Sequence, residues 1–300
     1  MNSHAASTAP LEPAGPLREF WQSFAENRGA LVALIVFAFI ALACLFAPVV
    51  APHDPIEQYR DAMLAPPVWA EGGSTRFLLG TDELGRDMLS RLLHGGRVSL
   101  GIGLASVLMS MIPGVLLGLA AAFFQRWASP AIMRVMDIVL ALPSLLLAIC
   151  VITVLGPGLV NTVIAIAIGA LPGYVRLTRA QALGEMGRDY VTASRVAGAG
   201  LPRLMFLTVL PNCLAPLIVN ATLGFSSAIL EVAGLGFLGL GVQPPTAEWG
   251  TMLSTARDYI ARAPWVVTLP GLSILVTVLS VNLMGDGLRD ALDPKLRKVS

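Results

Sequence analysis

Charge is scarce in this sequence of 300 residues. Asp, Glu, Lys and Arg together make up 13% of the chain, whereas hydrophobic residues make up 55%. Soluble domains carry about 25% charged residues. A chain with so little charge cannot cover a globular surface, so the composition excludes an ordinary soluble protein and a disordered one. The net charge is +1, and no basic excess points to nucleic acid.

Cysteine and histidine are also rare, with three residues of each type. The cysteines lack CxxC spacing and lie in apolar stretches, which indicates small buried side chains and no disulfide framework or zinc site. The histidines do not form an HExxH pair, and the chain has neither a GxxxxGK[ST] phosphate loop nor a GxSxG elbow. We therefore expect no enzyme activity, no bound cofactor and no metal site on this chain.

Long apolar segments are abundant instead. A membrane-spanning helix needs about 20 mostly apolar residues. Six segments meet or approach this length, so we expect an all-α integral membrane fold with about six transmembrane helices. The expected spans cover residues 31–51, 98–124, 137–155, 159–174, 213–230 and 265–284.

The basic residues favour one orientation of these spans. With a cytoplasmic N-terminus, the inside segments hold 13 Lys and Arg and the outside segments hold seven. Both termini are therefore expected in the cytoplasm. The expected organisation is a cytoplasmic tail over 1–30, a first transmembrane helix over 31–52, an extracytoplasmic segment over 53–97, a five-helix core over 98–289 with a cytoplasmic loop over 176–211, and a cytoplasmic tail over 290–300.

Small residues recur at every fourth position of the second expected span. Positions four apart share one face of a helix, so the pattern predicts a surface that another helix can approach closely. The residues are Ser106, Ser110, Gly114, Gly118 and Ala122.

The loop over 176–211 is too long for a simple turn between helices. Apolar residues at helical spacing predict a short helix over 189–197, and Gly198 and Gly200 predict a bend after it. A second helical pattern then leads into Pro211. Such a helix, bend and helix could dock into a groove on a partner protein, or lie on the membrane surface as an amphipathic connector.

Residues in this loop resemble a known motif. The spacing runs Thr192-Ala193-Ser194, three residues, Gly198, nine residues and then Thr208-Val209-Leu210-Pro211. This spacing is similar to that of the EAA loop of ABC importer permeases. Thr192 stands in place of the motif's Glu, and Thr208 in place of its Ile. The resemblance implies a coupling helix seated in a cytoplasmic ATPase. The residues implied to make this contact are Tyr190, Thr192, Ala193, Ser194, Arg195, Gly198, Leu210 and Pro211.

Two further segments extend the resemblance. Residues 79–100 contain Gly-Thr-Asp and Gly-Arg-Asp, and predict an amphipathic helix at the outer surface, with an N-cap at Thr81 or Asp82 and with polar residues away from its apolar face. These polar residues are Arg86, Asp87, Ser90 and Arg91. Residues 236–250 form a glycine-rich turn that ends in a proline pair and Trp249-Gly250. Both segments resemble the dipeptide, oligopeptide and nickel branch of ABC permeases, and the extra N-terminal span resembles its C-type subunit.

The resemblance implies a type I importer core that translocates a solute delivered by an extracytoplasmic binding protein. Di- and oligopeptides are the expected solutes, and relatives also handle glutathione and nickel chelates. The implied partners are a second homologous permease chain and two ATP-binding subunits, which would hold the ATP and Mg²⁺. The implied location is the bacterial cytoplasmic (inner) membrane.

Several polar residues lie within or beside the expected spans. Asn220, Ser227, Glu231 and Asn282 either line a translocation pathway or form hydrogen bonds between helices. Glu231 could contact a peptide's amino group, or it could be a hydrated carboxylate at the outer end of the fifth span. For Asp137, an ion pair with Arg134, one turn away, is expected.

Two other functions remain open from the residues alone. A secondary transporter commonly carries internal repeats, and none is evident here. An intramembrane enzyme needs a nucleophile and a base inside the spans, and no histidine lies there.

Overall fold

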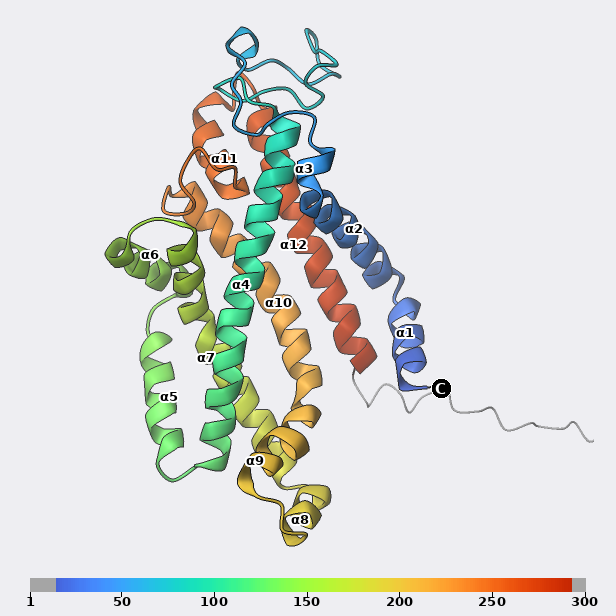
Figure 1. The fold of residues 1–300 in the computed structure, drawn as a ribbon, viewed down its shortest axis with the longest axis vertical. Coiled ribbons are helices and arrows are strands. Elements are labelled where there is room, and N and C mark those ends of the chain that lie inside the picture. The colour runs from blue at the N-terminus through green and yellow to red at the C-terminus, as the bar shows by residue number, and fades with distance from the viewer. Residues whose placement is uncertain (1–14, 293–300) are drawn as a thin grey trace, which may run out of the picture.

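The computed structural model describes residues 15–292, and the named elements over this range are all helices (Figure 1). Residues 1–14 and 293–300 lie outside the described residues, and so do parts of the two expected tails, 1–30 and 290–300. The helices are α1 (Pro16–Glu26), α2 (Arg28–Leu45), α3 (Ala47–Val50), α4 (Met88–Phe123), α5 (Ala128–Val139), α6 (Ser144–Leu155), α7 (Leu159–Met186), α8 (Asp189–Val196), α9 (Leu201–Arg203), a π-helical segment (Leu204–Val209), α10 (Leu210–Phe237), α11 (Trp249–Ala256) and α12 (Trp265–Leu292). Short 3₁₀ turns cover Arg60–Ala62 and Arg257–Tyr259.

Within the described range, five helical stretches are long and apolar enough to cross a membrane. They are α2, α4, α7, the continuous stretch Leu201–Phe237 and α12. The bent pair of α5 and α6 makes a sixth if it counts as one span. An all-α fold with about six spans is thus confirmed.

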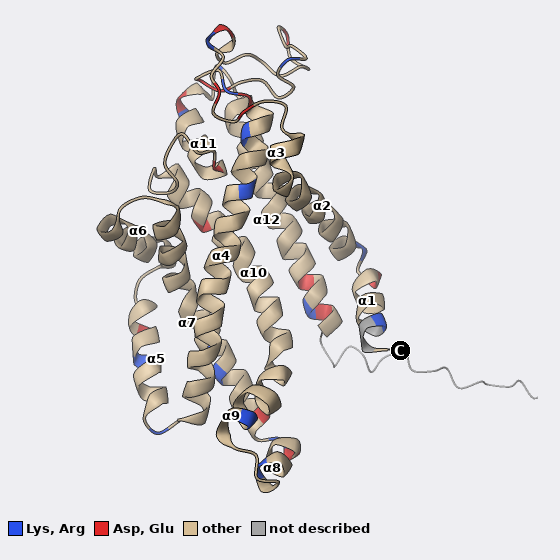
Figure 2. Ribbon diagram, viewed as in Figure 1, with Lys and Arg blue, Asp and Glu red and all other residues tan. Residues whose placement is uncertain are grey.

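The long helices run between two ends of the molecule (Figure 1). We call the end that holds α8 and α9 the α8 end, and the end that holds α11 and residues 51–87 the α11 end. The chain rises through α2 toward the α11 end and returns through α12, so α1 and the last turn of α12 lie away from the α11 end. There Phe24, Ala30 and Ala291 are buried together. The few charged residues gather toward the ends of the helices (Figure 2).

The predicted close approach at the small-residue face of α4 is confirmed. A Cβ added to Gly114 would lie 2.5 Å from the Tyr174 Cβ, and one added to Gly118 would lie 2.5 Å from the Thr178 Cβ. Both neighbours belong to α7. Because real Cβ atoms do not approach so closely, only glycine permits this contact between the two helix backbones.

The single helix expected over 137–155 is wrong. The structure has two helices there, α5 and α6, which meet at an angle of 87°. The break falls at residues 140–143 and ends at Pro143, which precedes α6. Proline lacks a backbone N–H and disfavours helical geometry in the residue before it, which favours a break at this position, although α4, α7, α10 and α12 continue through prolines of their own.

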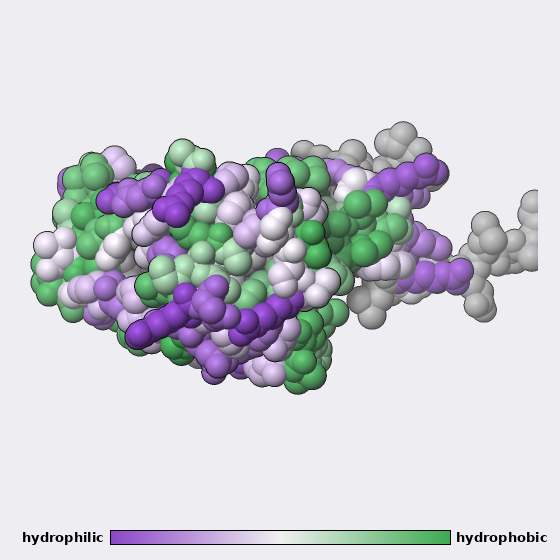
Figure 3. Space-filling model, turned by 90° about the horizontal axis from the view of Figure 1, so that it is seen from above, coloured by the Kyte–Doolittle hydropathy of each residue, from purple (hydrophilic) through white to green (hydrophobic). Residues whose placement is uncertain are grey.

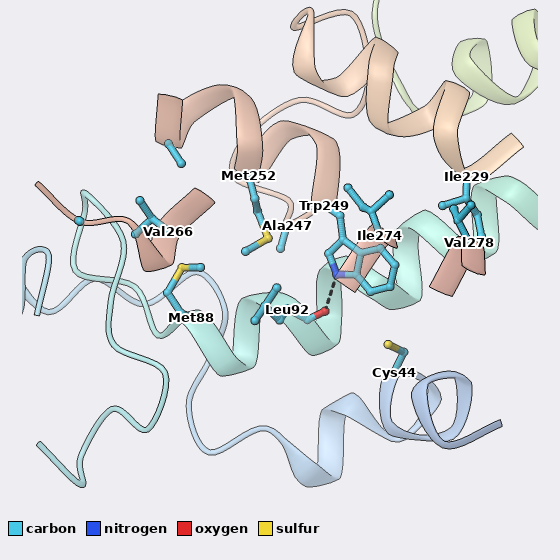
Figure 4. Close-up of a cluster of buried hydrophobic side chains, with 12 residues drawn as sticks. Cys44, Met88, Leu92, Ile229, Ala247, Trp249, Met252, Val266, Ile274 and Val278 are labelled. Carbon is cyan, nitrogen blue, oxygen red and sulfur yellow. Dashed lines mark hydrogen bonds between the residues drawn. The ribbon is translucent and has the colours of Figure 1, made fainter. Parts of the chain in front are cut away.

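A cluster around Trp249 holds the α11 end together (Figure 4). The Trp249 indole N–H donates a 2.9 Å hydrogen bond to the Leu92 carbonyl of α4. Gly96 makes room for the indole, since a Cβ there would lie 2.5 Å from Trp249 Cζ2 and 2.4 Å from Cys44 Sγ. The cluster therefore joins α2, α4 and α11 in one packed unit.

Candidate functional site

The first candidate site is the segment at the α8 end, residues 189–209, which we call the elbow. α7 continues to Met186, so the first part of the predicted loop over 176–211 is helical. The predicted short helix is present as α8. Val191 anchors it, because this side chain is fully buried with Ala182 of α7 and with Leu204 and Val209 of the π-helical segment.

Gly198 ends α8 in a defined turn. Its φ of +83° lies in the left-handed region, which glycine adopts without strain. The Ala199 N–H donates to the Ser194 carbonyl over 3.1 Å, and the Gly198 N–H donates to the Arg195 carbonyl over 3.0 Å. These two bonds form a Schellman motif, which satisfies carbonyls at the helix end. The left-handed backbone at this turn thus explains why the EAA-like spacing has a glycine at position 198.

Most of the predicted coupling residues lie on the surface of the elbow. Ser194 and Leu210 are half-buried, and Val196 between them is 85% exposed. An apolar side chain at such exposure leaves a contact surface open at the tip of the molecule. The exposed coupling residues are Tyr190, Thr192, Ala193, Arg195, Gly198 and Pro211.

A tyrosine fixes the junction between α7 and α8. The Tyr190 hydroxyl donates a hydrogen bond to the Glu185 carboxylate, and Arg188 lies 3.8 Å from the same carboxylate. Partial burial and the hydrogen bond to Glu185 raise the pKa of Tyr190 to about 12. The tyrosine is therefore a neutral donor at physiological pH, and it holds α8 against the end of α7.

The second candidate site is one face of α10. Asn220, Gly224, Ser227 and Glu231 recur at helical spacing, so they share this face. Ser227 and Glu231 line a cavity of about 160 Å³ bounded by α4, α6, α7 and α10. α10 continues to Phe237, so Glu231 lies within its last two turns, and its half-buried side chain is compatible with both of the roles predicted for it. Asn220 lies about a turn away from the cavity, toward the α8 end.

Asn282 is not part of this cavity. Its side-chain oxygen accepts a 2.6 Å hydrogen bond from the Ser226 hydroxyl, which joins α12 to α10. Of the two roles predicted for Asn282, the structure shows the hydrogen bond between helices.

The expected local pair of Asp137 with Arg134 is wrong. Asp137 on α5 forms an ion pair with Arg176 on α7, with 2.6 Å between Oδ1 and Nη2. The bend after α5 turns this helix alongside α7, so the nearest cation comes from a neighbouring helix and not from one turn away.

The third candidate region is residues 79–91 at the α11 end. The expected amphipathic helix at the outer surface is wrong, because Arg86, Asp87, Ser90 and Arg91 are all buried. The Asp82 carboxylate lies 2.6 Å from Arg86 Nε and 3.2 Å from Arg91 Nε. Residues 51–80 pack against this segment, with the His53 N–H donating to Ser90 and the Pro55 carbonyl accepting from Arg91, and the molecule seen from this end shows hydrophilic patches among hydrophobic side chains (Figure 3).

The helix cap in this region also differs from expectation. The residue that caps α4 is Asp87, not Thr81 or Asp82. The Asp87 carboxylate accepts hydrogen bonds from the Ser90 N–H over 2.9 Å and from the Ser90 hydroxyl over 2.6 Å. α4 begins at once with Met88, so the lead-in segment and the second span form one helix of 36 residues.

Glu248 is a buried carboxylate that sequence reasoning missed. It caps α11 by accepting hydrogen bonds from the Gly250 and Thr251 N–H groups over 2.8 and 2.9 Å, and it accepts another from the Ser99 hydroxyl. Burial raises the pKa of its carboxyl above the usual value, while these hydrogen bonds act in the opposite direction. The one feature of the sequence that could have pointed to Glu248 is its position directly before the Trp249-Gly250 pair.

Family profiles match most of the chain. Residues 114–298 match the binding-protein-dependent transport system inner membrane component, and residues 15–67 match the N-terminal TM domain of oligopeptide transport permease C. The chain belongs to the binding-protein-dependent transport system inner membrane components. This family comprises ABC importer permeases, so the chain is a permease subunit and a multi-pass protein of the inner membrane.

Whole-length relatives agree with this assignment. The di/tripeptide transport system permease protein DppC of Pseudomonas aeruginosa is 67% identical over 100% of this chain and 99% of its own length. The dipeptide transport system permease proteins DppC of Haemophilus influenzae and Escherichia coli K12 are 56% and 58% identical, each over 97% of this chain and over 100% and 97% of their own lengths.

A solved structure supports the type I permease fold. An inward-facing structure of the MetNI methionine ABC transporter has a TM-score of 0.56 at 19% identity, and covers 69% of this chain and 98% of that chain. At this identity the likeness concerns the fold alone.

Proposed function

We propose that this permease subunit moves dipeptides and tripeptides inward across the membrane, after an extracytoplasmic binding protein delivers them. The observation that carries the proposal is 67% identity over the full chain to a permease named for di- and tripeptide transport. Glu231 supports it, because a carboxylate at a cavity between the helices suits a solute that carries a positively charged group.

The proposed partners are a second, homologous permease chain and two ATP-binding subunits, with the elbow docked into one of the ATP-binding subunits. ATP and Mg²⁺ would be held by those subunits, and this chain would bind no cofactor. Support comes from the exposed surface of α8, which the buried Val191 attaches firmly to the rest of the fold.

The proposed topology places the α8 end and both termini in the cytoplasm, and the α11 end outside. The excess of Lys and Arg in the inside segments supports this orientation. The path of the chain agrees with it, since α1 and the end of α12 both lie away from the α11 end.

In the proposed mechanism, closure of the ATP-binding subunits displaces α8. The displacement passes through Val191 into the π-helical segment and α7, which pack together. α7 in turn fits closely against α4 at Gly114 and Gly118. The helices around the Glu231 cavity therefore move together, and they alternate between states open to either side of the membrane. Asn220, Ser227 and Glu231 would line the pathway on α10.

Uptake into proteoliposomes tests the proposal. The complete transporter with its binding protein is reconstituted with internal ATP, and accumulation of radiolabelled Ala-Ala and Ala-Ala-Ala is measured. We expect uptake of both peptides that depends on ATP and on the binding protein. Free alanine, glutathione and a nickel chelate serve as comparison solutes, and uptake of one of these in place of the peptides would contradict the proposed solute.

A further inference from the structure

The cavity beside Glu231 is lined by hydroxyl groups from four helices. Ser106 and Ser110 come from α4, Ser144 from α6, Tyr174 from α7 and Ser227 from α10. A volume of about 160 Å³ is well above the space that one water needs. Residues from four helices thus line one space, which lies beside the exposed Ser144 and Ser227 and has a mostly apolar wall.

Glu231 is the charged residue among those that line the cavity. No Lys, Arg or His lines it within the described part of the chain, and no side chain described there lies within ion-pair or hydrogen-bond distance of the Glu231 carboxylate. An unpaired carboxylate within a membrane span is costly, and such residues pair with a cation or with a substrate.

The serine hydroxyls around it are arranged as acceptors. Ser110 donates its hydrogen to the Ser106 carbonyl over 2.9 Å, and Ser227 donates to the Leu223 carbonyl over 3.3 Å. Because each hydroxyl gives its hydrogen to the backbone, its oxygen keeps a lone pair for a ligand. Ser110 is fully buried, so only the oxygen of the exposed Ser227 joins the Glu231 carboxylate in presenting acceptors to a ligand that carries N–H donors.

One donor also lines the cavity. The Tyr174 side chain is 2% exposed, and its hydroxyl has no hydrogen-bond partner among residues 15–292. Gly224 leaves the space that this hydroxyl occupies, since a Cβ there would lie 2.6 Å from the Tyr174 oxygen. A buried hydroxyl without a partner is costly, so this one is available to a ligand.

We propose that the Glu231 cavity binds the primary ammonium group of the transported solute. Glu231 supplies the charge, the Ser227 oxygen accepts an N–H hydrogen bond, and the Tyr174 hydroxyl at the wall of the cavity donates to a carbonyl next to the ammonium group. The inference rests on the proposed function, because a peptide with a free amino terminus presents an ammonium group beside a carbonyl.

Thiol labelling tests the charge preference of the cavity without any transport. Ser227→Cys is placed in a chain whose Cys44, Cys150 and Cys213 are replaced by alanine, within the assembled transporter. The labelling rates of a cationic reagent, aminoethyl methanethiosulfonate, and an anionic one, sulfonatoethyl methanethiosulfonate, are compared. We expect Glu231→Gln to lower the ratio of the two rates about tenfold, because it removes the charge beside the thiol.

The matched control is Asp258→Asn, which removes one carboxylate that is 80% exposed at the α11 end. This variant is expected to leave the ratio of labelling rates unchanged. A ratio that does not change in Glu231→Gln, or a Ser227→Cys chain that neither reagent labels, would overturn the inference.

Transport of Ala-Ala provides the second test. We expect Glu231→Gln and Tyr174→Phe to lower uptake, the former about ten- to hundredfold as expected for the loss of one charge-assisted hydrogen bond. ATPase stimulation by the loaded binding protein is expected to persist, and Glu231→Asp is expected to restore most of the uptake because it keeps the charge.

The outcomes separate the two proposals. Normal uptake by Glu231→Gln, beside a wild-type transporter that takes up Ala-Ala, would overturn the ammonium site and leave the proposed function standing. A wild-type transporter that takes up no peptide would overturn the proposed function, while the labelling ratio would still decide whether the cavity prefers a cation. Loss of the partner permease from the complex in Glu231→Gln, with an unchanged labelling ratio, would assign Glu231 to subunit pairing and overturn the inference.

Discussion

The Ser99 hydroxyl of α4 donates a 2.9 Å hydrogen bond to the Glu248 carboxylate, which precedes α11, although 149 residues separate the two. The Ser99 hydroxyl oxygen also accepts a 3.2 Å hydrogen bond from the backbone N–H of Trp249. This one serine therefore ties α4 to both the cap and the first residue of α11. The turn between α10 and α11 is held by polar contacts in a region otherwise packed with apolar side chains.

Ser99→Ala is expected to destabilise the chain by about 1–3 kcal/mol, because it leaves the buried Glu248 carboxylate and the Trp249 N–H each without one partner. Thermal unfolding of the purified chain in detergent measures this loss. Thr255→Ala is a suitable control, since this exposed residue of α11 bonds through its hydroxyl to carbonyls of its own helix. Equal effects of the two substitutions would contradict the importance of the Ser99 contact.

The stability of the chain should depend on pH through Glu248. Burial raises the carboxyl pKa in the folded state above the ordinary value of 4.5. The folded state therefore binds the proton more tightly than the unfolded state does. Its contribution to stability is present below pH 4.5 and is lost as the pH rises through the folded-state pKa. Glu248→Gln should flatten this part of the pH profile of unfolding, and a profile that keeps its slope would refute the assignment.

Asp82→Asn should be far more harmful than Asp61→Asn. Asp82 pairs with two buried arginines, Arg86 and Arg91, while Glu83 pairs with Arg86 alone. Loss of the Asp82 charge therefore leaves one buried positive charge uncompensated and is expected to cost about 3–5 kcal/mol. Asp61 also pairs with an arginine, Arg76, but both side chains are about half exposed or more. Its loss should cost at most about 1 kcal/mol. Unfolding midpoints of the two variants, measured side by side, provide the comparison.

Two valines of α8 are expected to separate stability from partner binding. Val191 is fully buried and Val196 is 85% exposed. Val191→Ala should destabilise the elbow by about 1–3 kcal/mol through the loss of buried methyl groups. Val196→Ser should leave unfolding unchanged, yet reduce the amount of ATP-binding subunit that co-purifies with the chain. If co-purification is unchanged in Val196→Ser, this face of α8 is not the docking surface.

The glycines after α8 offer a second matched pair. Gly198 has a φ of +83°, whereas Gly200 has a φ of −69°, and a Cβ at either position would meet open space. Gly198→Ala should therefore cost about 1–2 kcal/mol through backbone strain alone. Gly200→Ala should be nearly neutral. We expect Gly198→Ala to lower the coupling of ATP hydrolysis to uptake and Gly200→Ala to leave it intact, and the ratio of peptide transported to ATP hydrolysed measures this.

The features that could be predicted from the sequence are those that local patterns determine. Apolar length predicted the spans, small residues four apart predicted the contact of α4 with α7, and apolar spacing followed by glycine predicted α8 and its bend. Each of these depends on residues close together in the chain, where helix geometry alone relates spacing to position.

The features that could not be predicted depend on contacts between distant segments. Asp137 pairs with Arg176 only because the chain bends after α5, and the charges around Asp82 are buried only because residues 51–80 fold over them. Glu231 was placed at a helix end because its charge interrupted an apolar run. The structure shows that it lines a cavity together with residues of three neighbouring helices, which no local pattern reveals. Glu248 is an unusual residue type for a helix cap, so the cap preferences gave no signal.

The π-helical segment Leu204–Val209 has a further consequence. It leads directly from α9 into α10, so residues Leu201–Phe237 form 37 residues of continuous helix with no intervening loop. Glu231 lies 21 residues beyond Leu210, about 32 Å along the axis at 1.5 Å per residue. No loop interrupts this path, so a shift imposed at the elbow reaches the carboxylate through helix backbone, and the π-helical segment and Pro216 are the places where that backbone can bend. The elbow and the Glu231 cavity are thus two ends of one helix rather than two elements joined by a linker.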